Sequence, residues 1–432
     1  MKAFVIASLA LFSSCSVSAA DTDLIKQGEY LARAGDCVAC HTAKGGKPFA
    51  GGLPMETPIG VIYSTNITPD KTGLGDYSFE DFDKAVRHGV AKSGSTLYPA
   101  MPYPSYARVS DSDMQALYAY FMKGVEPVAQ ENKDSDIPWP LSMRWPLAAW
   151  RWMFAPTVAE VQPQAAADPV ISRGAYLVEG LGHCGACHTP RALTMQEKAL
   201  SATDGNAFLS GSAPLEGWIA KSLRGDHKDG LGSWSEEQLV QFLKTGRSDR
   251  SAVFGGMSDV VVHSMQYMSE NDLTAIARYL KSLPAVDPKD QPHLYDKQVA
   301  DALWKGDDSK PGASVYIDNC AACHRTDGHG YMRVFPALAG NPVLQTADAT
   351  SLINIVLNGG TLPATHTAPS TFTMPAFAWR LSDQEVADVV SFVRGSWGNK
   401  GTPVKASDVA DLRKNDMRTT SGDDLGQVTQ KH

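Results

Sequence analysis

Hydrophobic residues recur at helical spacing in three segments of the chain, at residues 110–124, 269–284 and 382–398. Each segment opens with a serine and carries an acidic residue in its first turn, as helix starts commonly do. The apolar positions then repeat every three or four residues, which is typical of a helix with one buried face. A shorter helical pattern precedes each segment, ending near residues 36, 183 and 319. The pattern predicts a mainly α fold built from a helical unit that occurs three times.

The composition is globular and argues against one class of partner. Of the 432 residues, 43% are hydrophobic and 20% are charged. A chain of this length is enough for roughly two to four domains. The net charge of -8 leaves no strongly basic surface to neutralise phosphates, so we expect no nucleic-acid partner.

The first twenty residues have the features of a cleaved signal peptide. Lys2 precedes an apolar run from Phe4 to Phe12, and small residues follow at positions 18–20. We expect the mature chain to start near Asp21, outside the cytoplasm. A faint likeness to a lipoprotein cleavage site at Cys15 is the alternative. No later stretch approaches the ~18 apolar residues of a spanning helix, so the mature chain is expected to be soluble or peripheral to a membrane.

Two linkers divide the rest of the chain. Residues 158–169 are rich in Ala, Pro and Gln, and residues 284–298 are rich in Pro and charge. They predict domains at 21–160, 167–285 and 300–400. The polar residues 401–432 are predicted to form an extended C-terminal arm.

Three copies of C-x-x-C-H contain all six cysteines of the predicted mature chain. The copies are Cys37, Cys40 and His41; Cys184, Cys187 and His188; and Cys320, Cys323 and His324. Close cysteine pairs each followed by histidine are not a disulfide framework. Neither the βαβ pattern of a thioredoxin-like dithiol nor a second pair of zinc ligands accompanies them. On a helical turn, positions i and i+3 share a face, so two thiols can bond the vinyl groups of one porphyrin while the histidine ligates its iron. The motifs predict three covalently bound c-type haems.

A second axial ligand is expected from the loop before each terminal helix. Met101 and Met374 lie in such loops. The second unit offers three candidates, which are Met257, Met265 and Met268. Met257 follows Gly246 by eleven residues and Met101 follows Gly89 by twelve, so Met257 is preferred, with Met268 second. Histidine opposite methionine fills both axial positions, which favours electron transfer over a peroxidase-like haem enzyme, the competing class.

Residues 137–156 form an unusual segment that carries four of the nine tryptophans, with Arg144 and Arg151. Prolines at 138, 140 and 146 exclude one long helix, so the segment cannot span a bilayer. Two interpretations stay open. The segment packs the first domain against the second, or it contacts a partner subunit or the membrane interface.

Four stretches around these motifs carry a family resemblance. They are GEYLARAGDCVACHTAKGG, PAMPYPSYARVSDSDMQALYAYF, GLGHCGACHTPRALTMQEKAL and CAACHRTDGHGYMRVFPALAGNP. They resemble the triple-haem cytochrome c subunits of bacterial membrane-bound dehydrogenases, over essentially the whole mature chain. Within that family they are most similar to the cytochrome subunit of flavin-dependent gluconate 2-dehydrogenase.

The resemblance implies three tandem cytochrome c-type domains and an electron-transfer function without substrate chemistry in this chain. It implies haem bonds at the six motif cysteines, proximal ligation by the three motif histidines, and distal ligation by Met101, Met257 and Met374. The implied partners are a large flavoprotein subunit that holds FAD and oxidises D-gluconate to 2-dehydro-D-gluconate, a small subunit, and ubiquinone. The implied location is the periplasmic face of the inner membrane. Alcohol, sorbitol, fructose or aldehyde dehydrogenases are the alternative partners.

Overall fold

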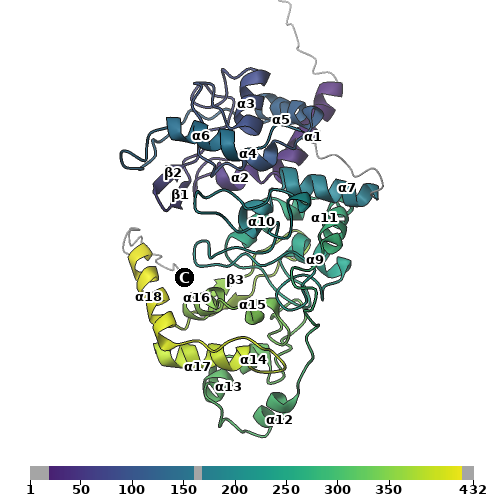
Figure 1. Cartoon of the computed structure of the whole chain (residues 1–432), viewed down its shortest axis with the longest axis vertical. Helices are drawn as coiled ribbons and strands as arrows, with labels where there is room; N and C mark the ends of the chain where they lie inside the picture. The colour runs from purple at the N-terminus through teal and green to yellow at the C-terminus, as the bar shows by residue number, and fades with distance from the viewer. Residues whose placement is uncertain (1–18, 160–167, 421–432) are drawn as a thin grey trace, which may run out of the picture.

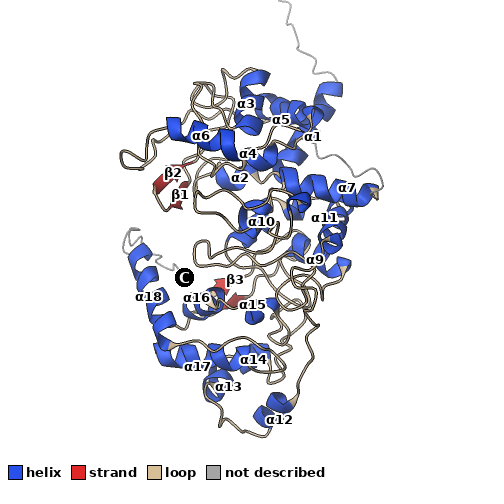
Figure 2. Ribbon diagram, viewed as in Figure 1, coloured by secondary structure: helices blue, strands red, loops and turns tan. Residues whose placement is uncertain are grey.

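Three helical units follow one another along the longest axis of the molecule (Figure 1). The computed structural model describes residues 19–159 and 168–420, so most of the predicted signal peptide lies outside the described residues. Helices dominate, and the strands of the described residues form two short antiparallel pairs (Figure 2). The predicted mainly α fold class is confirmed.

The first unit extends from the N-terminal helix to the tryptophan-rich segment. Its elements are α1 (Ala19–Ala34), α2 (Cys37–Cys40), β1 (Pro54–Thr57), β2 (Gly60–Tyr63), α3 (Phe79–His88), α4 (Tyr103–Tyr106), α5 (Asp111–Lys123) and α6 (Trp145–Phe154). Strands β1 and β2 form a hairpin in which Pro54 faces Tyr63. Pro146 lies in the first turn of α6, where a missing backbone N–H costs little. The helix therefore begins only after the prolines at 138 and 140, as expected.

The second and third units repeat the order of a first helix, a motif turn and a terminal helix. The second contains α7 (Pro169–Ala175), which continues as the π-helical turn η1 (Tyr176–Leu181), then α8 (Gly185–His188), η2 (Ala202–Asp204), α9 (Glu236–Thr245), α10 (Gly256–His263), η3 (Met265–Tyr267) and α11 (Glu270–Ser282). The third contains α12 (Gln298–Trp304), α13 (Ala313–Asn319), α14 (Ala321–His324), α15 (Pro342–Gln345), α16 (Thr350–Asn358), β3 (Gly360–Thr361), β4 (Thr373–Met374), α17 (Asp383–Arg394) and α18 (Ala406–Thr420).

The terminal helices α5, α11 and α17 begin as the sequence predicts. The side chains of Ser110, Ser269 and Ser382 each accept a hydrogen bond from the backbone N–H three residues later. Each serine thus satisfies one of the amides that a helix start leaves unpaired.

A reciprocal pair of contacts joins the first two units. The hydroxyl of Tyr30 on α1 donates to Asp272 on α11 at 2.6 Å, and that of Tyr176 after α7 donates to Asp113 on α5 at 2.6 Å. Each first helix therefore contacts the other unit's terminal helix through the same residue types. The two units are related by an approximate two-fold arrangement.

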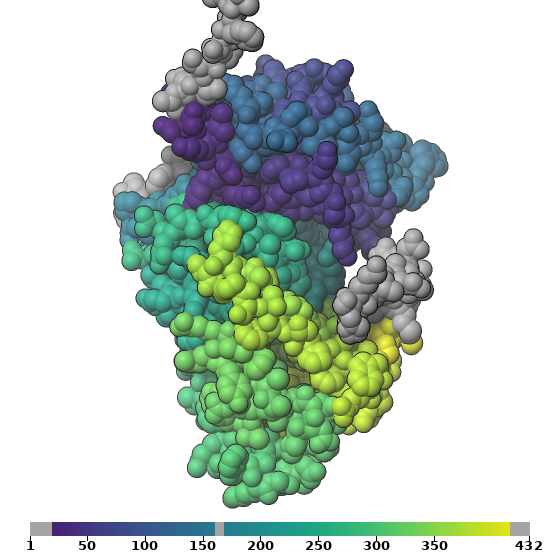
Figure 3. All heavy atoms as spheres, turned by 180° about the vertical axis from the view of Figure 1, so that it is seen from behind, coloured from purple at the N-terminus to yellow at the C-terminus, as the bar shows by residue number. Residues whose placement is uncertain are grey.

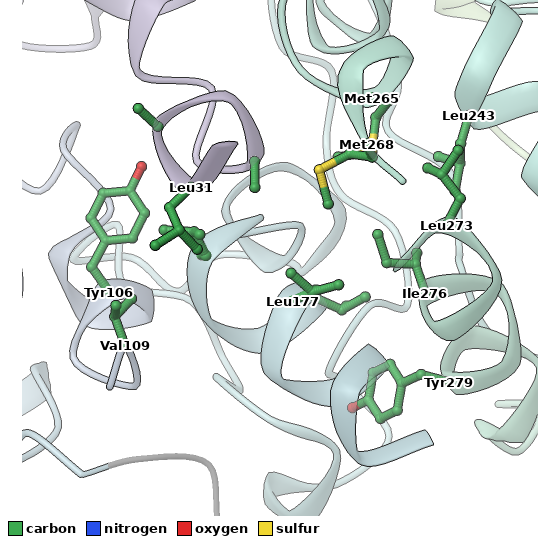
Figure 4. Close-up of a cluster of buried hydrophobic side chains, with 14 of the residues drawn as sticks. Leu31, Tyr106, Val109, Leu177, Leu243, Met265, Met268, Leu273, Ile276 and Tyr279 are labelled. Carbon is green, nitrogen blue, oxygen red and sulfur yellow. The ribbon is translucent and has the colours of Figure 1, made fainter. Parts of the chain in front are cut away.

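The buried hydrophobic side chains form two cores. One is shared by the first two units, and the other belongs to the third unit. Figure 4 shows Leu31 of α1 beside Leu177, Met268 and Ile276 of the second unit. The third core is centred on Trp397 and Tyr316, both of which have essentially no exposed surface.

The C-terminal segment differs from the predicted extended arm. Residues Ala406–Thr420 form α18, which packs against α17. Val409 is fully buried in the third core, and Arg413 donates to the carbonyls of Ala378 and Leu381 and pairs with Asp383. Because the segment is mostly polar, its sequence pattern did not indicate the few residues that attach it to the third unit.

One side chain of the tryptophan-rich segment supports the interpretation that this segment packs the first domain against the second. The indole N–H of Trp150 donates to the carbonyl of Thr194 in the second unit at 2.8 Å, and its ring lies edge-on to Tyr103. The other three tryptophans of the segment are largely exposed. No helix among residues 19–159 and 168–420 is long and apolar enough to cross a membrane.

Candidate haem sites

Each C-x-x-C-H motif lies on a short helical turn directly after a helix, which is α1, α7 with η1, or α13, as the spacing predicts. The six motif cysteines are free thiols. Burial raises the pKa of Cys37, Cys184 and Cys320 to about 12. A reactive dithiol or a zinc-binding thiolate needs a lowered pKa instead. The thiols therefore suit thioether formation better than either of those chemistries.

The three motif histidines share one hydrogen-bonding arrangement. The Nδ1 atom of His41 lies 2.7 Å from the carbonyl oxygen of Thr65, that of His188 lies 2.7 Å from Lys221 O, and that of His324 lies 3.0 Å from Pro336 O. Because a carbonyl only accepts, Nδ1 must carry the proton, which leaves the lone pair on Nε2. A second partner that fixes the tautomer in this way is typical of metal-ligating histidines.

Burial also lowers the pKa of all three histidines, although the carbonyl contacts oppose this shift. The neutral ring is the form that can ligate a metal. The orientation and the protonation state of all three histidines are thus those that metal ligation needs.

One cavity of about 1770 Å³ reaches all three motifs. Its lining includes Cys40 of the first motif and both cysteines and the histidine of the second and third motifs. Pockets for one small molecule usually measure about 300–1,000 Å³. The cavity therefore has room for more than one prosthetic group. Most of its lining is aliphatic or aromatic, as the wall around a porphyrin needs to be.

Five residues of the cavity wall have a buried polar side-chain atom without a hydrogen-bond partner among the described residues. Two of these atoms are the indole nitrogen of Trp234 and one carboxylate oxygen of Glu197, and the others belong to Asp36, Tyr98 and Asn319. Buried polar groups are nearly always hydrogen-bonded, so these atoms indicate a missing polar partner. The propionates of a haem would accept from the indole N–H. Burial raises the pKa of Glu197 to about 7, so its carboxyl can also donate when protonated. The wall thus fits the predicted cofactor.

Matching backbone hydrogen bonds place Met101 and Met257 at equivalent points of the first two units. Gly89 ends α3 and Gly246 ends α9, and the carbonyl of each accepts from an amide at 2.8 Å. The donors are Leu97 and Val253. Each predicted methionine follows its donor by four residues. Met257 is half-buried and lines the cavity, whereas Met101 is half-buried between two cavity-lining neighbours, Ala100 and Pro102.

Met268 occupies a different kind of position. It stands directly before Ser269, the N-cap of α11, as Val109 stands directly before Ser110, the N-cap of α5. Both side chains belong to the shared core and are almost completely buried. The geometry therefore matches Met257, not Met268, to Met101.

Met374 lies in a strand instead of a loop. It is in β4, opposite Gly360 of β3, and also lines the cavity. Gly359, next to Gly360, ends α16, as Gly89 ends α3 and Gly246 ends α9. Met374 follows Gly359 by fifteen residues, against twelve and eleven in the first two units, so the third unit brings its methionine to the cavity through a longer segment.

Comparisons with known proteins agree with this geometry. The Cytochrome c family matches residues 25–124 and 309–397. The chain is 67% identical to the gluconate 2-dehydrogenase cytochrome c subunit of Pantoea cypripedii, over 94% of this chain and 93% of that protein. It is 58% identical to the alcohol dehydrogenase (quinone) cytochrome c subunit of Gluconacetobacter polyoxogenes, over 91% and 85%. It is 36% identical to the fructose dehydrogenase cytochrome subunit of Gluconobacter japonicus, over 90% and 82%.

The chain belongs to the cytochrome c subunits of dehydrogenases. The resemblance seen in its motifs is confirmed, and membership implies covalently bound haem and an electron-transfer role. The family match does not cover residues 168–285 of this cytochrome subunit, but that unit has the same turn, histidine contact and glycine-to-methionine spacing as the first.

Sequence reasoning missed two groups in these sites. The carbonyls of Thr65, Lys221 and Pro336 carry no side-chain signal, so no sequence pattern would have found them. Trp234 could have been found from the sequence, because it directly precedes Ser235, the N-cap of α9, and follows a glycine-rich loop.

Proposed function

We propose that this chain is the electron-transfer subunit of a gluconate 2-dehydrogenase and carries three c-type haems. In this proposal the haems are bonded by Cys37 and Cys40, by Cys184 and Cys187, and by Cys320 and Cys323. The proximal ligands are His41, His188 and His324, and the distal ligands are Met101, Met257 and Met374.

One observation carries the relay function. The same turn, with the same Nδ1-to-carbonyl contact, recurs three times, and all three motifs reach one apolar cavity. Haem supplies one-electron chemistry when bound. The chain's own part is to hold each porphyrin edge, orient each imidazole, and exclude water with the apolar wall. A soft methionine sulfur on the far side would close the iron to substrate and raise its potential.

We infer the electron donor from the relatives and the electron acceptor from the resemblance carried by the motifs. Gluconate is proposed as the donor's substrate because the identity to a gluconate 2-dehydrogenase subunit is 67% over almost the full length of both chains. The proposed complex has a large FAD-containing subunit that converts D-gluconate to 2-dehydro-D-gluconate, and a small subunit. The two electrons released by each gluconate oxidation would pass one at a time through the haems to ubiquinone. We place the complex at the periplasmic face of the inner membrane, after signal peptide cleavage. The 58% identity to an alcohol dehydrogenase subunit makes an alcohol dehydrogenase the second candidate.

The complex purified from detergent-solubilised membranes tests both parts of the proposal. Intact mass spectrometry of this chain should show three haem masses that survive denaturation. Gluconate should reduce the haems through a flavoprotein subunit, and a quinone should reoxidise them. Fewer than three covalent haems would contradict the cofactor assignment. Reduction by ethanol alone, through a quinoprotein subunit, would replace the gluconate assignment with the alcohol one.

A further inference from the structure

The outer face of α6 is apolar along its whole length. Trp145 is 71% exposed, Trp152 83% and Met153 57%. The remaining exposed positions of the helix are Pro146, Ala148 and Ala149. A surface helix normally turns polar residues to solvent, so a face of this kind is expected to be covered.

The opposite face of α6 lies against the protein. Trp150 and Phe154 line the haem cavity, and Trp150 is bonded to Thr194. Next to Thr194, Leu193 is 99% exposed, and Trp139, in the loop before α6, is 80% exposed. We call Trp139, Trp145, Trp152, Met153 and Leu193 the apolar ridge. Seen from behind, the part of the chain around α6 projects from the side of the molecule (Figure 3).

The two arginines of this segment direct their guanidinium groups toward the first unit. The guanidinium of Arg144 lies 3.8 Å from the centre of the Tyr98 ring and donates to the carbonyl of Thr96. Arg151 donates to the carbonyl of His88. Both arginines are therefore engaged by the first unit. The side chains of the ridge offer only indole N–H groups for hydrogen bonding, and no acceptor.

These properties fit lipid better than a protein partner. Three indoles of this exposure amount to roughly 400–600 Å², below the ~800 Å² that each partner buries in a standard protein interface. Protein interfaces also surround their apolar centre with a hydrogen-bonding rim, which the outer face of α6 lacks. Exposed tryptophans that place a ring in the acyl boundary and the N–H among headgroups are typical of membrane interfaces.

We propose that the apolar ridge docks this subunit on a lipid bilayer, with α6 lying in the interfacial plane. The ten residues of α6 extend about 15 Å, half of the ~30 Å hydrocarbon core, so the helix lies on the membrane and does not cross it. Because the inner face of α6 lines the haem cavity, docking brings the cavity to the lipid surface. That consequence rests on the proposed function, since a membrane quinone would then meet the haems there.

Vesicle flotation of the full-length holo-subunit tests the proposal. The variants are a double substitution, Trp145→Ser with Trp152→Ser, and the matched control Trp304→Ser. Trp304 is equally exposed, at 83%, but lies on α12 in the third unit. With phosphatidylcholine vesicles, the wild type and the control should float, whereas the double variant should bind about tenfold or more weakly. Salt should change binding to phosphatidylcholine vesicles little, because neither this lipid nor the side chains of the ridge carry net charge.

Three results would overturn the proposal. The first is failure of the wild type to float, and the second is flotation of the double variant to the same extent as the control. The third, seen when each variant is also purified together with its dehydrogenase, is loss of the dehydrogenase subunit while vesicle binding persists. The last outcome would identify a protein interface. Unchanged haem spectra check the fold of each variant, and single substitutions replace the double one if it misfolds. Flotation needs no gluconate or flavoprotein, so its failure is separate from failure of the proposed function.

Discussion

Met257 and Met268 both line the cavity and both precede α11, but they differ in burial and in their place in the repeat. Met257 is half-buried, in the position equivalent to Met101. Met268 is 4% exposed and belongs to the shared core, in the position of Val109 directly before a serine N-cap (Figure 4). The proposed ligand is therefore Met257, and Met268 is expected to serve packing.

Replacing each methionine with leucine separates the two roles, because the volume is nearly conserved. Met257→Leu should remove the sulfur-to-iron charge-transfer band of one haem and lower the potential of that haem alone. Met268→Leu should leave all potentials unchanged and cost less than about 1.5 kcal/mol of unfolding free energy. Redox titration and chemical denaturation measure both effects. A lowered potential in Met268→Leu, with none in Met257→Leu, would reverse the assignment.

In each of the first two units, two helices cross in close contact at a glycine. Gly28 of α1 lies against α5, and a Cβ there would stand 2.0 Å from the carbonyl oxygen of Ala116. Gly174 of α7 lies against α11 in the same way, with Ala275 O at 2.0 Å. Both crossings need the backbones to approach more closely than any side chain allows. The reciprocal contacts of Tyr30 with Asp272 and Tyr176 with Asp113 lie beside these crossings.

Gly28→Ala and Gly174→Ala should each destabilise the chain by about 1–3 kcal/mol, because the added methyl group forces the helices apart. Gly180→Ala is the matched control, since a Cβ there meets only the Cβ of Arg108, at an ordinary contact distance of 3.5 Å. Urea denaturation followed by circular dichroism measures the midpoints. Equal midpoints for all three variants would show that the crossings tolerate separation.

At the scale of the whole molecule, the third unit is attached differently from the first two. Its core is separate, and its hydrogen bonds to the second unit are made largely with loops of that unit. The Lys221 ammonium donates to the carbonyl of Pro342 at 3.0 Å, while its own carbonyl holds His188. The Arg247 guanidinium donates to the carbonyls of Ala368 and Ser370. Polar boundaries of this kind couple neighbouring domains weakly.

We therefore expect two unfolding transitions for the holo-subunit. One belongs to the core shared by the first two units, and the other to the third unit. Differential scanning calorimetry resolves the two transitions, and loss of the third haem's native spectrum should follow only one of them. A single transition, with equal calorimetric and van't Hoff enthalpies, would show that the units unfold together.

The sequence by itself determined the local features. A motif turn, a serine N-cap and an amphipathic helix each depend on residues within a few positions of one another, so spacing alone identifies them. The motif turns, the terminal helices and the absence of one long helix across the prolines at 138, 140 and 146 were all predicted in this way. The preference for Met257 also came from spacing, measured from the glycine that ends the preceding helix.

Only the tertiary structure decided contacts between distant residues. The carbonyl that orients His188 belongs to a residue 33 positions away, and Tyr30 meets its carboxylate 242 positions away. Backbone acceptors have no residue signature, and pairings over such distances depend on how the helices cross. The helix Ala406–Thr420 was predicted as an arm for the same reason. Its stability comes from burying Val409 in a core made by other elements, which no local pattern within the segment displays.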